Sequence, residues 1–272
     1  MTMADDQESA PTEVTDKGAD TDADGAGEFA AEPRDQVVLV HGLWMTGAES
    51  VVLRRRLSQL DFGVRQFSYR SVRDGLAENA RQLHAFTEEI DSERLHLVGH
   101  SLGGLVILRL LAEITDFRPG RVVLLGSPLQ GSEVADRLAQ WPFGEQVLGR
   151  SIADDVLASP KREWDGSRDL GIIAGSKAVG MGRVVTKLRR PNDGTVTVAE
   201  TRLPGAKAHR VLPVTHSTLL FSSLVADHIA RFLREGRFPP KAKKPKTMKN
   251  EKVTSKQSPP QSAAVADDTI EA

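Results

Sequence analysis

The chain of 272 residues contains no cysteine, and this absence excludes disulfide bonds, thiolate metal ligands and thiol nucleophiles. A membrane-spanning helix is not expected either, since no run of 18 apolar residues exists and Arg109 interrupts even the stretch 105–111. No apolar segment typical of a signal peptide precedes residue 36, so neither a signal peptide nor a lipid anchor is expected. The cytoplasm is therefore the expected compartment.

The charges of each terminal segment are almost all of a single sign, negative at the amino terminus and positive at the carboxyl terminus. Residues 1–34 carry ten carboxylates against Lys17 and Arg34, for a net charge of −8. Residues 241–256 carry seven lysines against one glutamate, for a net charge of +6. The formal net charge of −1 for the whole chain is thus a cancellation between two tails. Residues 35–240 hold 27 basic and 23 acidic side chains, an ordinary balance for one globular domain.

Both tails have few large hydrophobic side chains to bury. Residues 1–34 are rich in Asp, Ala and Gly, and residues 241–272 are rich in Lys, Pro and Ser. Because so little burial cannot offset the entropy of ordering, we predict that both tails are disordered. The lysine-rich tail could make weak contact with an anionic surface, but it has no aromatic residue, and a solubilising role is the simpler interpretation. We expect no nucleic-acid partner.

Between the tails, short apolar runs alternate with segments of helical periodicity, a pattern typical of a parallel sheet covered by helices. The predicted strands are 36–40, 63–69, 95–99, 121–125, 171–174 and 210–214. Helical spacing of apolar side chains predicts helices at 53–60, 76–90, 101–114 and 221–232. The sequence therefore predicts an α/β domain over residues 35–240, with a mostly parallel sheet of about six strands. Ligands in such sheets bind beyond the carboxyl ends of the strands.

The segment 94–114 has the pattern of a strand, a sharp turn and a helix. Its turn has Gly99 two positions before Ser101 and Gly103 two positions after it. Such glycines are typical of a nucleophile elbow, because the turn brings the backbone and the following helix too close for a Cβ atom. The turn holds the serine in a sparsely allowed conformation and exposes its Oγ above the sheet. An ordinary helix N-cap is the competing interpretation of Ser101.

With this elbow the chain resembles the α/β-hydrolase family, and in particular its small lipase-like and esterase-like members. The resemblance extends over nearly all of residues 36–235. A second motif, VVLVHGLW at 37–44, resembles the strand and His-Gly pair that supply half of the oxyanion hole in this family. The resemblance implies that the backbone N–H groups of Leu43 and Leu102 stabilise the oxyanion. It also implies that His41 braces this loop and is not a base.

A serine nucleophile needs a base, and the base needs a carboxylate. In this family the order along the chain is serine, acid, histidine. Three histidines follow Ser101. His216 follows the last predicted strand and precedes the last helix, where the family has its catalytic histidine. His209 begins that strand, and His228 lies on the apolar face of the helix. We therefore predict that His216 is the base.

For the carboxylate, the turn Pro-Asn-Asp-Gly presents Asp193, 23 residues before His216. This turn resembles the acid loop of lipase-like hydrolases. An aspartate that only caps its own turn is the competing interpretation. Glu133 and Asp136 are alternative acids, because some hydrolases take their acid after the preceding strand. Residues 178–190 lengthen the path to Asp193 relative to the simplest family pattern.

Residues 133–169 lie where many relatives insert a cap, and here the segment is short. It contains Trp141 and Phe143, which together with Trp44 are the predicted lining of a substrate pocket. A helix that merely packs on the sheet would need similar side chains, so a partial cap and a packing helix both stay open as interpretations.

The resemblance implies hydrolysis of carboxylic esters through a Ser101–His216–Asp193 triad and an acyl-enzyme. The expected substrate is a small-molecule or lipid ester, and no metal or organic cofactor is expected. An acyltransferase, a thioesterase or a perhydrolase with the same triad is an open alternative. A non-catalytic binding module with this fold is another, because fold does not fix function.

Overall fold

The computed structural model describes residues 35–152, 156–157, 162–179 and 187–240. The two predicted disordered tails, 1–34 and 241–272, lie outside the described residues. The elements below belong to a compact unit that ends at Phe238, and of the residues after it only Pro239 and Pro240 are described.

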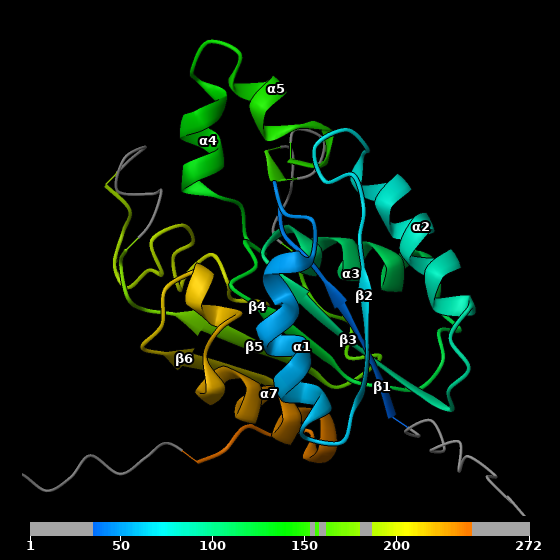
Figure 1. Ribbon diagram of the computed structural model, residues 1–272. Helices are drawn as coiled ribbons and strands as arrows, with labels where there is room; N and C mark the ends of the chain where they lie inside the picture. The colour runs from blue at the N-terminus through cyan, green and yellow to red at the C-terminus, as the bar shows by residue number, and fades with distance from the viewer. Residues whose placement is uncertain (1–34, 153–155, 158–161, 180–186, 241–272) are drawn as a thin grey trace, which may run out of the picture. The chain divides into compact units, whose positions relative to one another are not determined.

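Six strands form one sheet in which every neighbouring pair is parallel, in the order β2-β1-β3-β4-β5-β6 (Figure 1). The strands are β1 (Asp35–Val40), β2 (Gly63–Phe67), β3 (Arg94–His100), β4 (Val122–Leu125), β5 (Leu170–Gly175) and β6 (Ala208–Leu212). Each overlaps a predicted strand, so the predicted α/β fold with a six-stranded sheet is confirmed. Strand β6 ends two residues earlier than predicted, because Pro213 has no N–H with which to continue the ladder.

Two pairs of helices cover the two faces of the sheet (Figure 1). One pair is α1 (Val51–Ser58) and α7 (Ser223–Glu235), and the other is α2 (Leu76–Glu88) and α3 (Leu102–Glu113). Strand side chains alternate between these layers, as in β1, where Val37 packs with α1 and α7 while Val38 packs with α2 and α3. This burial on both faces explains why the strands are continuous apolar runs.

Two arginines at the amino-terminal edge of the sheet bind the ends of helices on opposite faces. Arg118 donates to the carbonyls of Thr87 and Ile90 at the end of α2. Arg121 Nη1 donates to the Leu233 carbonyl of α7 at 2.6 Å. A cation favours the carboxyl end of a helix, where unpaired carbonyls carry partial negative charge. These contacts fix α2 and α7 against the sheet.

Several short helices follow the carboxyl ends of the strands. They include η1 (Ala48–Ser50) after β1, α4 (Glu133–Ala139) and then α5 (Gly144–Leu148) after β4, and η3 (Ser217–Leu219) after β6. The chain leaves β1 toward β2 on one side, and β3 lies on the other side of β1. The segments that follow β1 and β3 therefore diverge at the carboxyl edge, and such a divergence is where open α/β sheets bind ligands.

Candidate active site

Ser101 lies between β3 and α3 in a backbone conformation that residues with a side chain rarely adopt, with φ 54° and ψ −122°. The neighbouring glycines make this turn possible. A Cβ atom on Gly99 would lie 2.7 Å from Gly104 Cα, and one on Gly103 would lie 2.3 Å from the Val40 carbonyl oxygen. The turn therefore has the close backbone approach that the Gly-x-Ser-x-Gly pattern predicts, and it is not an ordinary helix cap.

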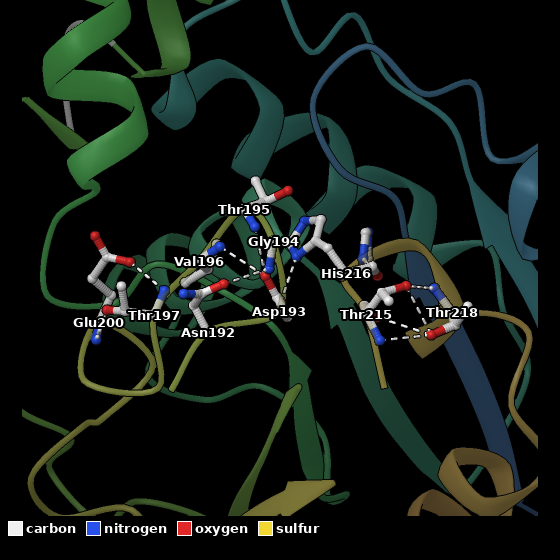
Figure 2. Close-up of polar contacts among 11 residues, drawn as sticks. Asn192, Asp193, Gly194, Thr195, Val196, Thr197, Glu200, Thr215, His216 and Thr218 are labelled. Carbon is white, nitrogen blue, oxygen red and sulfur yellow. Dashed lines mark hydrogen bonds and ion pairs between the residues drawn. The ribbon is translucent and has the colours of Figure 1, made fainter. Parts of the chain in front are cut away.

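The Asp193 carboxylate joins its own turn to His216. One oxygen, Oδ2, lies 2.8 Å from His216 Nδ1 (Figure 2). The other, Oδ1, accepts from the backbone N–H groups of Thr195 at 2.9 Å and Val196 at 2.7 Å. The His216 backbone N–H also donates to the Asp193 carbonyl at 2.9 Å. Asp193 thus caps its turn and orients the histidine at the same time, so the two interpretations of this residue do not exclude each other.

The electrostatic balance at Asp193 favours the ionised carboxylate. Burial raises the pKa of Asp193, but the charge and hydrogen bond of His216 and the two turn amides together hold it below the usual range. The ionised carboxylate accepts from Nδ1–H and leaves His216 Nε2 unprotonated in the neutral ring. His216 can then take a proton at Nε2.

Glycines at the ends of two strands make room for this pair. Gly126 follows β4 with φ +57°, and a Cβ there would lie 3.1 Å from both Asp193 Oδ2 and His216 Nδ1. A Cβ on Gly175, the last residue of β5, would lie 2.7 Å from Asp193 Cβ. The positions of these two glycines directly at strand ends are the signal in the sequence that points to such a close approach.

His41 holds the loop that carries the predicted oxyanion donor Leu43. Its Nε2 accepts from the Tyr69 backbone N–H at 3.2 Å, so its Nδ1 carries the hydrogen and donates to the Gly42 carbonyl at 2.8 Å. The ring stacks on Tyr69 at 4.3 Å between centroids, and the Tyr69 hydroxyl donates to the His41 carbonyl at 2.8 Å. Burial lowers the pKa of His41. A neutral His41 with both nitrogens bound to the backbone is a brace.

The bond to Gly42 also orients the next amide. The Gly42 carbonyl and the Leu43 N–H belong to one trans peptide and point in opposite directions, so anchoring the carbonyl at His41 directs the N–H away from that ring. Within the described part of the chain, neither the Leu43 nor the Leu102 amide donates a hydrogen bond to another residue. Both amides are therefore available to a ligand.

Ser101, His216, Leu43 and Leu102 all line one cavity of about 300 Å³. Asp193 does not line it and is only 1% exposed, so it lies behind His216. The structure thus brings together, around a single cavity, the predicted nucleophile, the predicted base and the two predicted oxyanion donors.

Apolar side chains of the segment 132–152 form much of the remaining wall. They are Val134, Ala135, Leu138, Leu148 and Ile152. Among the residues that the structure describes, no lysine, arginine, aspartate or glutamate lines this cavity. The interior is therefore suited to an uncharged, apolar group.

Of the three aromatic residues predicted to line the pocket, one lines the cavity and two do not. Trp44 lines the cavity and donates from its indole Nε1 to the Val147 carbonyl at 3.0 Å. Trp141 and Phe143 do not line it, and their side chains are 51% and 77% exposed. They lie between α4 and α5, beyond the apolar stripe of α4 that faces the cavity. Shorter aliphatic side chains take the place that the sequence analysis gave to these two aromatics.

The alternative bases and acids lie elsewhere. His209 Nε2 pairs with Thr201 Oγ1 at 2.9 Å, and His228 Nδ1 pairs with the Leu224 carbonyl at 2.7 Å. Glu133 pairs with Arg189, and Asp136 is exposed on α4. None of these four lines the cavity, and His216 pairs with Asp193 instead. Of the long segment 178–190, residues 180–186 lie outside the described residues.

Sequence reasoning missed His100, which precedes the nucleophile. Its Nε2 lies 3.1 Å from the His216 carbonyl oxygen, and the two rings are 4.7 Å apart between centroids. Burial lowers the pKa of His100 to about 3, with a smaller contribution from His216. The neutral ring therefore donates from Nε2 and helps to fix the backbone of His216. Adjacency to Ser101 is the one signal in the sequence, and it does not indicate this contact.

A second cavity, of about 600 Å³, lies at the amino-terminal edge of the sheet. Its four arginines are already bound. Arg94 pairs with Asp35 at 3.6 Å, Arg118 and Arg121 hold helix ends, and Arg168 Nη2 donates to the Phe117 carbonyl at 2.9 Å. Arg121 also pairs with Asp169 at 3.1 Å. Although larger, this cavity has a lining of structural contacts and lies away from Ser101.

The sequence model of the Alpha/beta hydrolase family matches residues 37–249. The chain therefore belongs to the alpha/beta hydrolase family. No curated protein matches the chain in sequence.

Solved structures of lipases and esterases share the fold. The mature form of the Bacillus licheniformis lipase BlEst2 has 18% identity and a TM-score of 0.59, over 76% of this chain and 93% of that one. The metagenomic carboxyl esterase MGS0156 has 19% identity and a TM-score of 0.54, over 75% and 76%. The Bacillus subtilis carboxylesterase CesB has 14% identity and a TM-score of 0.51, over 76% and 85%. At these identities the likeness shows the fold alone.

Among the helices of the residues that the structure describes, none is long and apolar enough to cross a membrane. In the same residues, no group of three or more His, Asp or Glu side chains is arranged to hold a metal ion.

Proposed function

We propose that the chain is a serine hydrolase that cleaves carboxylic esters. The observation that carries this proposal is the 2.8 Å bond between Asp193 Oδ2 and His216 Nδ1, with His216 and Ser101 on one cavity. An ion pair alone would be a structural feature. Beside a serine held at φ 54° and two backbone amides that donate to no other described residue, it has the parts that acyl transfer requires.

In the acylation step, Ser101 Oγ attacks the ester carbonyl carbon while His216 Nε2 takes its proton. The carbonyl oxygen becomes an oxyanion and accepts from the Leu43 and Leu102 amides, which are held rigid by the fold and need no reorganisation. Asp193 stabilises the resulting imidazolium. The imidazolium then gives its proton to the leaving alcohol, and the acyl group stays on Ser101 as an ester.

In the deacylation step, a water molecule replaces the alcohol. His216 Nε2 takes a proton from the water, and the hydroxide oxygen attacks the acyl carbon. The same two amides hold the second oxyanion. Its collapse breaks the bond to Ser101 Oγ, which takes the proton back from His216, and the carboxylic acid leaves. Every proton is accounted for by these residues, so the proposed reaction needs no metal or organic cofactor.

The apolar lining supports an ester with a hydrophobic acyl group, from a small molecule or a lipid. In this proposal the described part of residues 133–169 acts as a partial cap, because Val134, Leu138 and Leu148 line the cavity that Ser101 also lines. The catalytic part of the chain is residues 35–240, since all the proposed site residues fall inside it.

Covalent labelling by a fluorophosphonate tests for an activated serine. The wild-type chain is expected to be labelled at Ser101, and Ser101→Ala and His216→Ala are expected to lose the label. His209→Ala is the matched control, since His209 bonds Thr201 away from the cavity, and it should label like wild type. No labelling of a folded wild-type chain would contradict the proposal, and parallel assays of oxygen esters and thioesters would separate esterase from thioesterase.

A further inference from the structure

The segment 147–151, whose Leu148 lines the cavity, is tied to the rest of the domain at several points. At its start, the Val147 carbonyl accepts from the Trp44 indole at 3.0 Å. After α5, the Arg150 backbone N–H donates to the Val72 carbonyl at 3.2 Å. Gly149 lies so close to this loop, with φ +75°, that a Cβ atom would be 2.3 Å from the Val72 oxygen.

A buried polar contact completes the attachment. Ser151 is fully buried, and its Oγ donates to the Asp74 carbonyl at 2.8 Å while it accepts from Asn79 Nδ2 of α2 at 2.9 Å. Buried hydrogen bonds of this kind cannot be exchanged for water unless the segment lifts off, which would leave their partners unsatisfied. The segment therefore forms a fixed wall.

Adjacent residues on this segment point in different directions. Leu148 is 2% exposed and lines the cavity, whereas Val147 is 49% exposed and does not. Leu148 thus limits the space that a ligand attached to Ser101 can occupy. Two other lining residues, Trp44 and Val179, are far more exposed than Leu148, at 45% and 63%. These two therefore belong to its mouth.

From this fixed, uncharged cavity, and resting on the proposed function, we infer that the enzyme selects neutral acyl chains of medium length and that Leu148 sets the limit. A methylene group is about the size of a water molecule, ~30 Å³, so 300 Å³ holds about ten such groups, including the reacting carbonyl. The leaving alcohol shares this space with the acyl chain, so the expected optimum is shorter, about six to eight carbons. Longer chains must leave part of their length in water.

The test is a series of p-nitrophenyl esters from two to sixteen carbons, with kcat/KM measured for the full chain. Each buried methylene raises kcat/KM by up to about fourfold until the wall is reached. We expect kcat/KM to reach its maximum at about six to eight carbons and to rise no further by twelve. Leu148→Trp should move the maximum to four carbons or fewer while two-carbon ester hydrolysis persists. Leu148→Ala should extend it to longer chains.

Val147→Trp is the matched control, since it adds the same side chain one residue away, outside the cavity, and should leave the profile unchanged. A wild-type profile that shows no dependence on chain length from two carbons upward, or that is still rising at twelve to sixteen carbons, would overturn the inference. A Leu148→Ala profile identical to that of the wild type would also overturn it. This second variant adds no bulk to the cavity, so a failure to fold from overpacking does not affect it. Failure of the proposed function would look different, because no ester of any length would be cleaved and Ser101 would not react with a fluorophosphonate.

Discussion

The carboxylate of Asp193 lies 2.8 Å from His216 Nδ1, while its second oxygen is held by the amides of Thr195 and Val196 (Figure 2). The turn amides therefore hold the Asp193 carboxylate in place, and the carboxylate in turn orients the His216 ring. Two further backbone bonds hold His216, through its own N–H to Asp193 and through its carbonyl to His100. The histidine has little freedom to rotate away from the cavity.

Asp193→Asn is expected to lower kcat for ester hydrolysis by ~10³ to 10⁴, because an amide N–H facing His216 Nδ1 favours the wrong tautomer. The turn should survive, since the amide oxygen can still accept from Thr195 and Val196. Steady-state kinetics with a soluble ester measures the effect. Asp136→Asn is the control and should change kcat by less than twofold. A kcat for Asp193→Asn within tenfold of wild type would remove Asp193 from the proposed triad.

His41→Phe is expected to lower kcat by about tenfold to hundredfold with KM changed far less. The phenyl ring keeps the stack on Tyr69 but cannot anchor the Gly42 carbonyl, so the Leu43 amide loses its orientation, and a lost oxyanion donor typically costs ~10² or more in rate. His84→Phe, on the outer part of α2, controls for the substitution itself. Unchanged kcat in a folded His41→Phe would show that the Leu43 amide does not depend on this brace.

The buried histidines predict acid sensitivity. Burial lowers the pKa of His100 to about 3 and that of His96 to about 4, from about 6.5 in the unfolded chain. Between these values the unfolded chain binds more protons than the folded one, so the free energy of unfolding must fall as the pH drops from about 6.5 toward 4. Each such histidine contributes a slope of up to ~1.4 kcal/mol per pH unit.

Urea unfolding at several pH values would measure that slope. His100→Gln keeps a hydrogen-bond donor near the His216 carbonyl but removes one titrating group. The slope of its free energy of unfolding against pH should therefore be lower by up to ~1.4 kcal/mol per pH unit. An equal slope for wild type and His100→Gln over pH 4 to 6.5 would mean that His100 is not held neutral in the fold.

The sequence predicted the layers of this fold and the strained turn at Ser101, because both depend on local patterns. Continuous apolar runs predicted the six strands, and the spacing of glycines around Ser101 predicted the strained turn. The sequence did not predict contacts that depend on how distant segments pack. The bond from His100 to His216 joins residues 116 apart, and that from Trp44 to Val147 joins residues 103 apart.

Trp141 and Phe143 are a second example of positions that the sequence did not predict. Their size made them reasonable candidates for a hydrophobic pocket, but size does not say which way a short connection turns. In the structure they are exposed between α4 and α5, while Leu138 and Leu148 face the cavity. Only the register of two short helices decides this, and five to seven residues carry too little periodicity to predict it.

Deletion of residues 1–34 and 241–272 is expected to leave kcat/KM for a soluble ester within about twofold of the full chain. The physical reason is that every proposed site residue lies between residues 43 and 216, and the described helices and strands lie between 35 and 235. Deleting each tail separately, at matched ionic strength, controls for effects of the large opposite charges. A large loss on removal of either tail would assign that tail a part in catalysis.

The rate of ester hydrolysis by Ser101→Ala tests the central claim most directly. This change removes one oxygen atom and leaves the Cβ atom, so the elbow should keep its conformation, as thermal unfolding can verify. The account predicts a loss of ~10⁴-fold or more in kcat relative to wild type, because removing the nucleophile also removes the acyl-enzyme route. A folded Ser101→Ala variant that hydrolyses esters at a rate close to wild type would contradict it.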